Sequence, residues 1–168
     1  MRRRHAGEVI EVIELTVVGV RVEVPSNQPL VLLREVDGER FLPIWIGPWE
    51  ANAIAMALQG LEPPRPLTHD LMKEMLETLG VTVNQVVVTE LREGTFYAVI
   101  DMSHNSERIE ISSRPSDAIA LAVRMGVRIF AEEEVLDAAA VRIPEEDQEE
   151  EIEKFRSFLD QVTPEDFK

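Results

Sequence analysis

The alternation of apolar and polar positions first predicts strands in the N-terminal part of the chain. Residues 9–24, "VIEVIELTVVGVRVEV", are rich in β-branched side chains and partly alternate in polarity, so they predict a long strand with a bulge at Gly19. The runs "QPLVLLREV" and "ERFLPIWIG" lie on either side of Asp37–Gly38. Because Asp-Gly readily adopts the positive φ angles of a tight connection, this pattern predicts a hairpin. Pro43 lacks an N–H group, which places an edge or a bulge in the second strand.

Helix signals follow this hairpin. Proline at a first helical position and glycine just past the last one mark helix ends, and they predict three helices within Pro48–Gln59, His69–Leu79 and Arg114–Gly126. In the second helix, Thr68 is the expected N-cap. Apolar residues recur there at helical spacing and predict one apolar face, made of Leu71, Met72, Met75, Leu76 and Leu79.

Between the second and third helices lie three more strand-like runs, "VTVNQVVVTEL", "GTFYAVIDMS" and "ERIEISS". Turn-forming residues at Glu93–Gly94 and Ser103–Ser106 separate them, which predicts an antiparallel meander. Strands, then helices, then a meander favour an α+β fold. We therefore expect a mixed, largely antiparallel sheet, built from the N-terminal hairpin and the three-stranded meander and packed with three main helices.

The C-terminal part differs in composition. The run "AEEEVLDAAA" predicts a short helix. After it, a flexible joint is expected near Pro144. Apolar residues then recur at helical spacing and predict an amphipathic helix, with Ile152, Phe155, Phe158 and Leu159 on one face. We divide the chain into an N-terminal extension at residues 1–8, a domain at 9–140 and an acidic appendage at 141–168.

Composition narrows the class of protein. The chain has 168 residues, of which 45% are hydrophobic and 5% aromatic, as in a globular domain with an aliphatic core. We find no transmembrane run and no signal-peptide segment, so we expect a cytoplasmic protein without a membrane partner. Since cysteine is absent, a metal would need carboxylates or the imidazoles of His5, His69 and His104.

The net charge of −15 argues at first against nucleic acid, because a polyanion usually meets a basic surface. Its distribution weakens that argument. Residues 1–131 hold 13 Lys and Arg against 18 Asp and Glu, a balance of −5, whereas residues 132–168 hold 4 against 14, a balance of −10. Two thirds of the net negative charge thus lies in residues 132–168. We expect this acidic tail to contact a basic partner or to regulate the domain.

The segment "RPSD" at residues 114–117 raises a chemical question. Pro115 fits a first helical turn, and Ser116 and Asp117 are suited to bind its free N–H groups. Arg114 is harder to explain, because the positive end of a helix dipole disfavours a cation. Two explanations stay open: an ion pair with Asp117 or Glu50, or contact with an anion such as phosphate.

A weak internal repeat links two of the helices. "GPWEANAIAMALQG" and "RPSDAIALAVRMG" share a proline, an acid two residues later, an alanine-rich helix and a final glycine. Common helix-end preferences explain this similarity. The alternative is that two equivalent helices line one cleft.

Two further motifs carry candidate chemistry. In "PRPLTHD", Arg65 precedes a helix whose first turn holds His69 and Asp70. His69 is either a general acid or base or a local hydrogen-bonding residue. In "PIWIGPWE", Trp45 and Trp49 are expected in the core or an interface, with base stacking as the alternative.

Four segments, taken together, resemble the bifunctional nuclease domain family. They are "FLPIWIGPWEANAIAMALQG", "PRPLTHDLMKEMLETLG", "VVVTELREGTFYAVI" and "ISSRPSDAIALAVRMGVRIFA". Their order and spacing are also similar to that family, and the resemblance covers roughly residues 9–140. It implies hydrolysis of phosphodiester bonds in DNA and RNA with little sequence preference.

The resemblance also directs attention to charged residues within those segments. We expect Arg114 and Arg65, with Ser116, to bind phosphate, because guanidinium groups match phosphate oxygens. The candidate catalytic residues are Asp117, Asp70, His69 and Glu50, and the three carboxylates among them are candidate ligands for Mg²⁺ or Mn²⁺. We expect no organic cofactor.

Two other functions fit the same residues. In a non-catalytic interaction module, arginine–carboxylate pairs would hold helices together in a homo-oligomer. In a small-anion or nucleotide-binding protein, the helix N-termini would bind the ligand. We expect a homo-oligomer, with DNA and RNA as substrates.

Overall fold

The computed structural model describes residues 1–5 and 7–161. Within them the chain forms nine strands, which are β1 (Arg2–His5), β2 (Glu8–Glu23), β3 (Gln28–Glu35), β4 (Arg40–Trp45), β5 (Thr82–Arg92), β6 (Thr95–His104), β7 (Glu107–Ser113), β8 (Arg128–Glu132) and β9 (Val141–Arg142). It also forms five helices, which are α1 (Pro48–Leu58), α2 (Thr68–Thr78), α3 (Pro115–Met125), α4 (Glu133–Ala139) and α5 (Glu145–Gln161).

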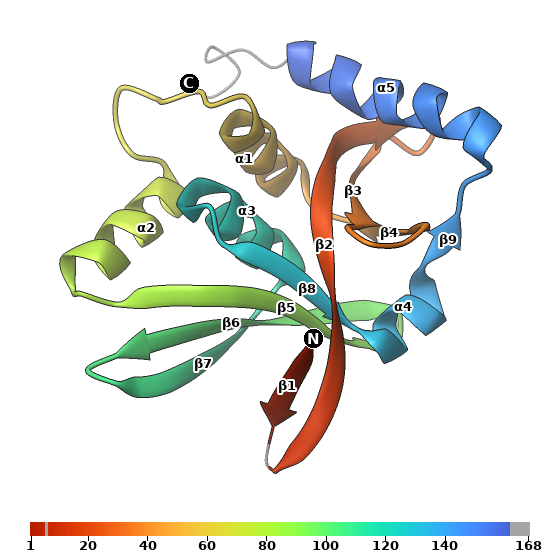
Figure 1. Cartoon of the computed structure of the whole chain (residues 1–168). Coiled ribbons are helices and arrows are strands. Elements are labelled where there is room, and N and C mark those ends of the chain that lie inside the picture. The colour runs from red at the N-terminus through yellow and green to blue at the C-terminus, as the bar shows by residue number, and fades with distance from the viewer. Residues whose placement is uncertain (6, 162–168) are drawn as a thin grey trace.

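The strands form one mixed sheet in the order β7-β6-β5-β8-β2-β3-β4-β9, with β1 paired to β2. Only the β5–β8 pair is parallel among the described strands. The predicted N-terminal hairpin is β3–β4 beside β2, and the predicted meander is β5–β6–β7 (Figure 1). The α+β prediction is confirmed. Strand β8 joins the two halves of the sheet, because it pairs with β2 on one side and β5 on the other.

The two faces of the sheet pack against different helices. Val31 and Leu33 of β3 belong to the main aliphatic core with α1 and α3, whereas the alternating Leu30 and Leu32 pack with Phe155 of α5. Successive strand residues point to opposite faces. The sheet is therefore covered on one face by α1 and α3, with α2 packed on α3, and on the other face by α5 over β2 and β3 (Figure 1).

The helix boundaries follow the sequence signals closely, with two corrections in α2. Its N-cap is Leu67 rather than Thr68. The predicted apolar face is divided: Met72 and Leu76 pack on the core, while the remaining members are exposed, namely Leu71, Met75 and Leu79. The core contact of α2 is thus narrower than its sequence pattern indicates.

The turns show which glycines the backbone needs. The register of β2 against β3 shifts between Val17 and Gly19, so the predicted bulge is confirmed. The Asp37–Gly38 turn also forms, but Gly38 is not among the residues with positive φ. An added Cβ at Gly38 would collide with the carboxylate of Glu35, so that carboxylate would have to move.

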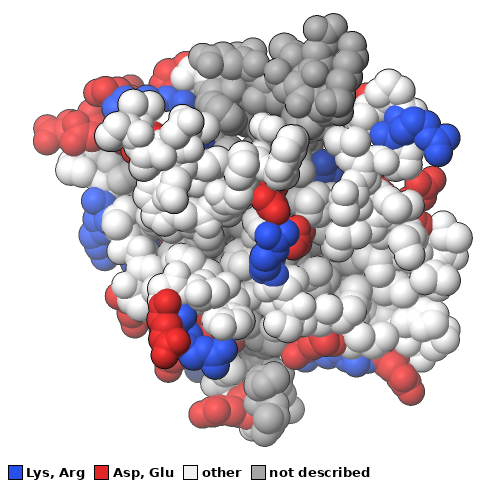
Figure 2. Space-filling model, turned by 180° about the vertical axis from the view of Figure 1, so that it is seen from behind, with Lys and Arg blue, Asp and Glu red and all other residues white. Residues whose placement is uncertain are grey.

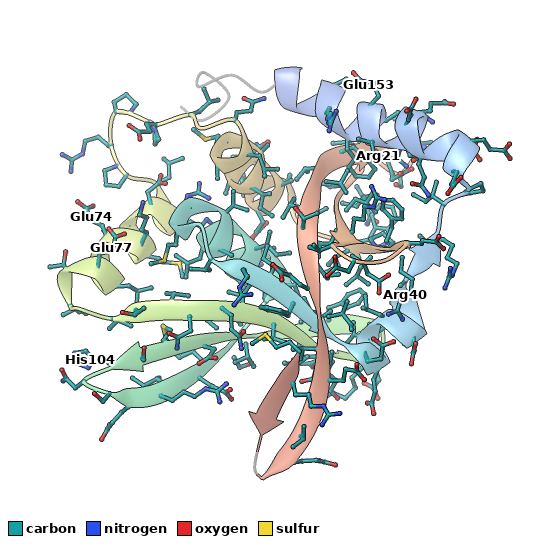
Figure 3. All side chains as sticks on the ribbon, in the orientation of Figure 1. Arg21, Arg40, Glu74, Glu77, His104 and Glu153 are labelled. Carbon is teal, nitrogen blue, oxygen red and sulfur yellow. The ribbon has the colours of Figure 1, made fainter. Side chains whose placement is uncertain are left out.

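The predicted C-terminal helix is α5, and it is packed on the sheet rather than separate from it. Phe155 is 1% exposed, and the Arg21 guanidinium lies 4.7 Å from the centre of its ring. Arg21 also forms an ion pair with Glu151 at 2.9 Å, and Figure 3 shows it beneath α5. The side chains of Phe158 and Leu159, which were predicted on the same face, lie outside the described residues.

A search of the described helices for a bilayer-spanning segment finds none that is both long and apolar enough.

We predict that Phe155→Ala destabilises the fold by about 3–5 kcal/mol, because it leaves a cavity between α5 and the sheet. Urea denaturation followed by circular dichroism measures this change. Leu79→Ala is the matched control, since Leu79 is 64% exposed and its truncation should change stability by no more than about 0.5 kcal/mol. Equal effects of the two substitutions would contradict the docking of α5.

Candidate active site

The starts of α1, α2 and α3 surround a cleft of about 580 Å³. Its lining residues are Trp49, Glu50, Ala53, Pro66, Leu67, Thr68, His69, Leu71, Arg114 and Asp117. Each helix contributes its first turn, where backbone N–H groups have no partner within the helix. The cleft therefore combines helix N-termini with charged side chains.

Arg114 lies between two carboxylates from different helices. Its Nε donates to Oδ2 of Asp117 at 2.9 Å, and an Nη2 nitrogen lies 2.9 Å from Oε1 of Glu50. The predicted ion pair is thus formed with both candidate acids. The arginine is still 64% exposed on its side chain, and its Nη1 group has no protein partner within the described part of the chain.

The internal repeat describes two helices that meet at one cleft. Pro48 and Pro115 begin α1 and α3, and the acids two residues later, Glu50 and Asp117, bind the same guanidinium. Neither helix has a side-chain hydrogen bond at its N-cap. The expectation that Ser116 and Asp117 cap α3 is therefore wrong, because the Asp117 carboxylate instead binds Arg114 and a histidine.

That histidine is His69, which is 7% exposed. Its Nε2 lies 2.9 Å from Oδ1 of Asp117. If Nε2 carries the proton and donates it to the carboxylate, Nδ1 holds a lone pair. Nδ1 makes no hydrogen bond to any described residue, so it is available to exchange a proton with a molecule in the cleft.

The electrostatics keep Asp117 ionised. Burial raises the pKa of its carboxyl, but hydrogen bonds from Arg114 and His69 outweigh burial and lower the pKa below its ordinary value. The same bond to Asp117, followed by that to Glu50, raises the pKa of the Arg114 guanidinium. Both members of the Arg114–Asp117 pair are thus held in their charged forms.

Three predicted site residues lie outside this network. Asp70 accepts a hydrogen bond from the Leu67 N–H at 2.9 Å and pairs with Arg124 at 2.7 Å, so it holds the start of α2 and joins it to α3. Arg65 is exposed in the segment between α1 and α2 and does not line the cleft. Ser116 lines a neighbouring hollow. Their predicted roles stay predictions.

The predicted metal ligands are not clustered. Among the side chains that the structure describes, which are those of residues 1–2 and 7–157, no group of three or more His, Asp or Glu is placed to hold a metal ion. Both oxygens of Asp70 and both of Asp117 already bind protein donors. His104 lies at the tip of the β6–β7 hairpin (Figure 3), and the side chain of His5 lies outside the described residues. The predicted need for Mg²⁺ or Mn²⁺ stays a prediction.

Both tryptophans are exposed, so the expectation that they belong to the core is wrong. Trp45 is 54% exposed at the end of β4, and Trp49 is 76% exposed in the first turn of α1. Trp49 lines the cleft beside Glu50. The interface and base-stacking alternatives are both consistent with this exposure.

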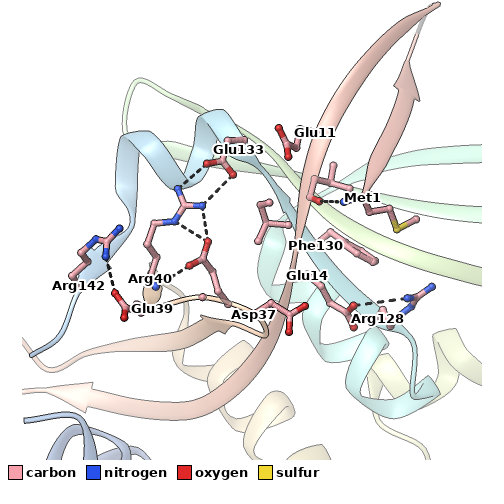
Figure 4. Close-up of a pocket in the computed structure, with 14 residues that line it drawn as sticks. Met1, Glu11, Glu14, Asp37, Glu39, Arg40, Arg128, Phe130, Glu133 and Arg142 are labelled. Atoms are coloured by element: carbon pink, nitrogen blue, oxygen red, sulfur yellow. Dashed lines mark hydrogen bonds and ion pairs between the residues drawn. The ribbon is translucent and has the colours of Figure 1, made fainter. Parts of the chain in front are cut away.

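Sequence reasoning missed a second charged cluster, around Arg40 in a hollow of about 760 Å³. Arg40 pairs with Glu35 at 2.6 Å and with Glu133 at 3.0 Å (Figure 4). Hydrogen bonds to Glu133 and Glu35 raise its pKa. The three arginines of this hollow all have carboxylate partners, so we interpret it as a structural joint between α4 and the β3–β4 turn. Arg40 and Glu133 lie 93 residues apart in sequence, so no local motif marks that pair.

No broad basic surface accompanies the cleft on the face shown in Figure 2. Small groups of positive and negative side chains lie there among wide uncharged areas. Any anion bound on this face would meet separate positive side chains rather than a continuous positive stripe.

Comparison with known proteins places this geometry in a family. Residues 31–144, which hold the whole His69–Asp117–Arg114–Glu50 network, match the model of the bifunctional nuclease domain. The chain belongs to the bifunctional nuclease domain family. The resemblance predicted from the sequence motifs is confirmed.

Relatives of the chain fall into two groups. "Uncharacterized protein Rv1829" of Mycobacterium tuberculosis is 52% identical over 163 residues, which are 92% of this chain and 98% of that protein. "Bifunctional nuclease 1" of rice (Oryza sativa subsp. japonica) is 30% identical over 106 residues, 61% of this chain and 32% of the rice protein. "Bifunctional nuclease 1" of Arabidopsis thaliana is 30% identical over 108 residues, 62% of this chain and 33% of that protein. The match to the plant proteins thus spans about a third of their length.

The lowered pKa of Asp117 predicts how stability depends on pH. Because the folded-state pKa lies below the ordinary 3.8, the ion pair contributes full stability above that value and loses it as pH falls through the folded pKa. Wild type should therefore exceed Asp117→Asn in stability at neutral pH, and the difference should shrink below about pH 4. Urea denaturation at a series of pH values measures it. A difference that stays constant to about pH 2 would contradict the assignment.

A glycine next to the cleft provides a second test. Gly47 has a φ of −74°, which alanine tolerates, but an added Cβ would collide with Oε2 of Glu50. Gly47→Ala should therefore move Glu50 away from Arg114. In a double-mutant cycle, Glu50→Gln should then cost less stability in the Gly47→Ala background, by about 0.2–1 kcal/mol. Strictly additive effects would show that the alanine leaves the ion pair intact.

Proposed function

We propose that this domain hydrolyses phosphodiester bonds in DNA and RNA, with little sequence preference, in the cleft between α1, α2 and α3. The observation that carries the proposal is the exposed Arg114 guanidinium next to the His69–Asp117 pair. A phosphoryl-transfer site needs a cation for the phosphate oxygens and a group that moves a proton. The names of the plant relatives support the same class of reaction.

Each residue of the network has a role in this proposal. The free donors of Arg114 bind the phosphate oxygens and stabilise the negative charge that grows on them in the transition state. Nδ1 of His69 takes a proton from the attacking water as the water oxygen bonds to phosphorus. The P–O bond to the leaving ester oxygen breaks, and that oxygen takes a proton from solvent. The Asp117 carboxylate accepts the hydrogen bond from Nε2, which fixes the ring and stabilises the imidazolium that forms. Glu50 positions the guanidinium from the side of α1.

A divalent metal is a separate part of the proposal. Mg²⁺ or Mn²⁺ would add positive charge at the phosphate. The arrangement of Asp70, Asp117 and Glu50 does not fit a three-carboxylate site, so we derive no step through a metal. Cleavage assays in Mg²⁺, Mn²⁺ and EDTA address the requirement directly.

The test is cleavage of single-stranded DNA and RNA by highly purified wild type and variants. We expect Arg114→Ala to lower the rate by about 10²–10³-fold, because it removes the charge that stabilises the transition state. His69→Ala should lower the rate by about 10²–10⁴-fold through loss of the proton-transfer group. Thermal denaturation of each variant verifies that the fold is kept.

Arg65→Ala is the matched control. It removes the same charge at an exposed position that does not line the cleft. If phosphate binds in the cleft alone, cleavage by this variant stays near wild type, whereas the predicted phosphate contact of Arg65 would lower it. Equal cleavage by wild type and Arg114→Ala would overturn the assignment of the cleft, and a loss in Arg65→Ala as large as in Arg114→Ala would extend the site beyond it.

A second candidate function is that of a homo-oligomeric interaction module. It is favoured by the exposed stripe of Leu71, Met75 and Leu79 on one side of α2, since large exposed apolar patches commonly mark interaction sites. Sedimentation of wild type and of Met75→Glu tests this second function. If α2 forms the interface between copies, Met75→Glu should sediment as a monomer. Cleavage in the α1–α3 cleft should persist in that monomer.

A further inference from the structure

A second hollow adjoins the cleft and shares Arg114 with it. It has a volume of about 580 Å³ and is formed by the end of β4, the β5–β6 turn and the start of α3. Arg114 lines both hollows, so a chain-like ligand that contacts this guanidinium can extend into each of them. The two hollows together form a path on both sides of the arginine.

An exposed tryptophan lies in each half of this path. Trp49 lines the cleft and Trp45 lines the second hollow, and Phe96 lies in the second hollow as well. Tryptophan side chains are usually largely buried, because they carry the largest apolar surface of any residue. Exposure of 76% and 54% on either side of one cation therefore needs an explanation.

The charges of the second hollow favour an anionic ligand. Arg114 is the one charged residue among those that line it, in a chain with a net charge of −15. Carboxylates, which are abundant elsewhere, are absent from this lining. The two carboxylates that pair with Arg114, Glu50 and Asp117, line the first cleft and are not among the residues that line this hollow.

The start of α3 supplies unused hydrogen-bond donors to the same hollow. Ser116 is 6% exposed and lines it, yet its hydroxyl has no hydrogen-bond partner among the side chains and backbone groups that the structure describes. No side chain caps the N-terminus of α3, so the first-turn N–H groups are also available. Phosphate oxygens match such donors. An apolar subunit interface would instead bury them unpaired.

We infer that Trp49 and Trp45 are base-stacking platforms for a single-stranded nucleic acid whose phosphate binds Arg114 and Ser116. This inference rests on the proposed function and adds to it the strandedness of the substrate. Stacking needs unpaired bases that can leave their neighbours, and it tolerates any sequence because every base has a π face. In a duplex the bases are already stacked and paired, so the two indoles would contact only its backbone.

The experiment measures binding of labelled probes in EDTA by fluorescence anisotropy at fixed salt. The probes are an oligothymidylate of about 12 nucleotides, an abasic phosphodiester of the same length and charge, and the corresponding duplex. We expect wild type to bind the oligothymidylate at least about fivefold more tightly than the abasic strand or the duplex, which is the lower end of the range for one stacked base.

Variants of the two tryptophans test whether the indole rings cause the preference for strands that carry bases. Trp49→Ala and Trp45→Ala should each weaken oligothymidylate binding by about fivefold or more and leave abasic binding unchanged. The matched controls Trp49→Phe and Trp45→Phe keep a ring and should keep most of the affinity. Since the chain has two tryptophans, each phenylalanine variant has a single indole whose fluorescence should be quenched by the oligothymidylate.

The outcomes separate this inference from the proposed function. The stacking role is overturned if wild type binds base-bearing and abasic strands equally. It is also overturned if the alanine variants bind and cleave like wild type. Both conclusions hold even if Arg114→Ala abolishes cleavage. Alanine variants that bind normally but sediment as smaller species overturn it in favour of contact with a second copy of the chain. Base-dependent, tryptophan-dependent binding without cleavage supports the stacking role and leaves the proposed hydrolysis unsupported.

Discussion

The pairing of β8 with both β5 and β2 is the constraint on which the rest of the structure depends. Without β8, the meander and the N-terminal hairpin would be two separate sheets with exposed edges. Because β8 runs parallel to β5, the chain must cross over the sheet before entering it, and α3 is that crossover. The crossover places the start of α3 next to the start of α1, and thereby brings Arg114 within reach of Glu50.

The candidate site follows from that juxtaposition. Two helices that begin alike each place an acid in the first turn, and one arginine neutralises both. Asp70 and Arg124 join α2 to α3 in the same way, which holds His69 against Asp117. The ion pairs thus serve the packing of helices and the chemistry of the cleft together. Exposed pairs add little stability on their own, so their main contribution here is orientation of the imidazole and the guanidinium.

The family assignment and the geometry complement each other. The match to the bifunctional nuclease domain covers the cleft but specifies no residue roles. The structure separates the charged residues of the matching motifs into a connected set at the α1–α3 junction, a helix-joining pair at Asp70, and Arg65 on an exposed segment. The structure also shows that Trp45 and Trp49 are exposed near this site. Their apolar side chains alone predicted burial.

The sequence by itself determined the local structure: strand periodicity, the Gly19 bulge, and helices bounded by proline and glycine, because these depend on neighbours within a few residues. From the dipole argument it also offered two explanations for Arg114, an ion pair with Glu50 or Asp117 and contact with an anion. Only the tertiary structure decided that both pairs form, that His69 joins them, and that Phe155 docks α5 on the sheet. Apart from Arg114–Asp117, which are three residues apart, those contacts join residues dozens of positions apart. Such contacts are set by sheet order and helix packing, which no local pattern encodes.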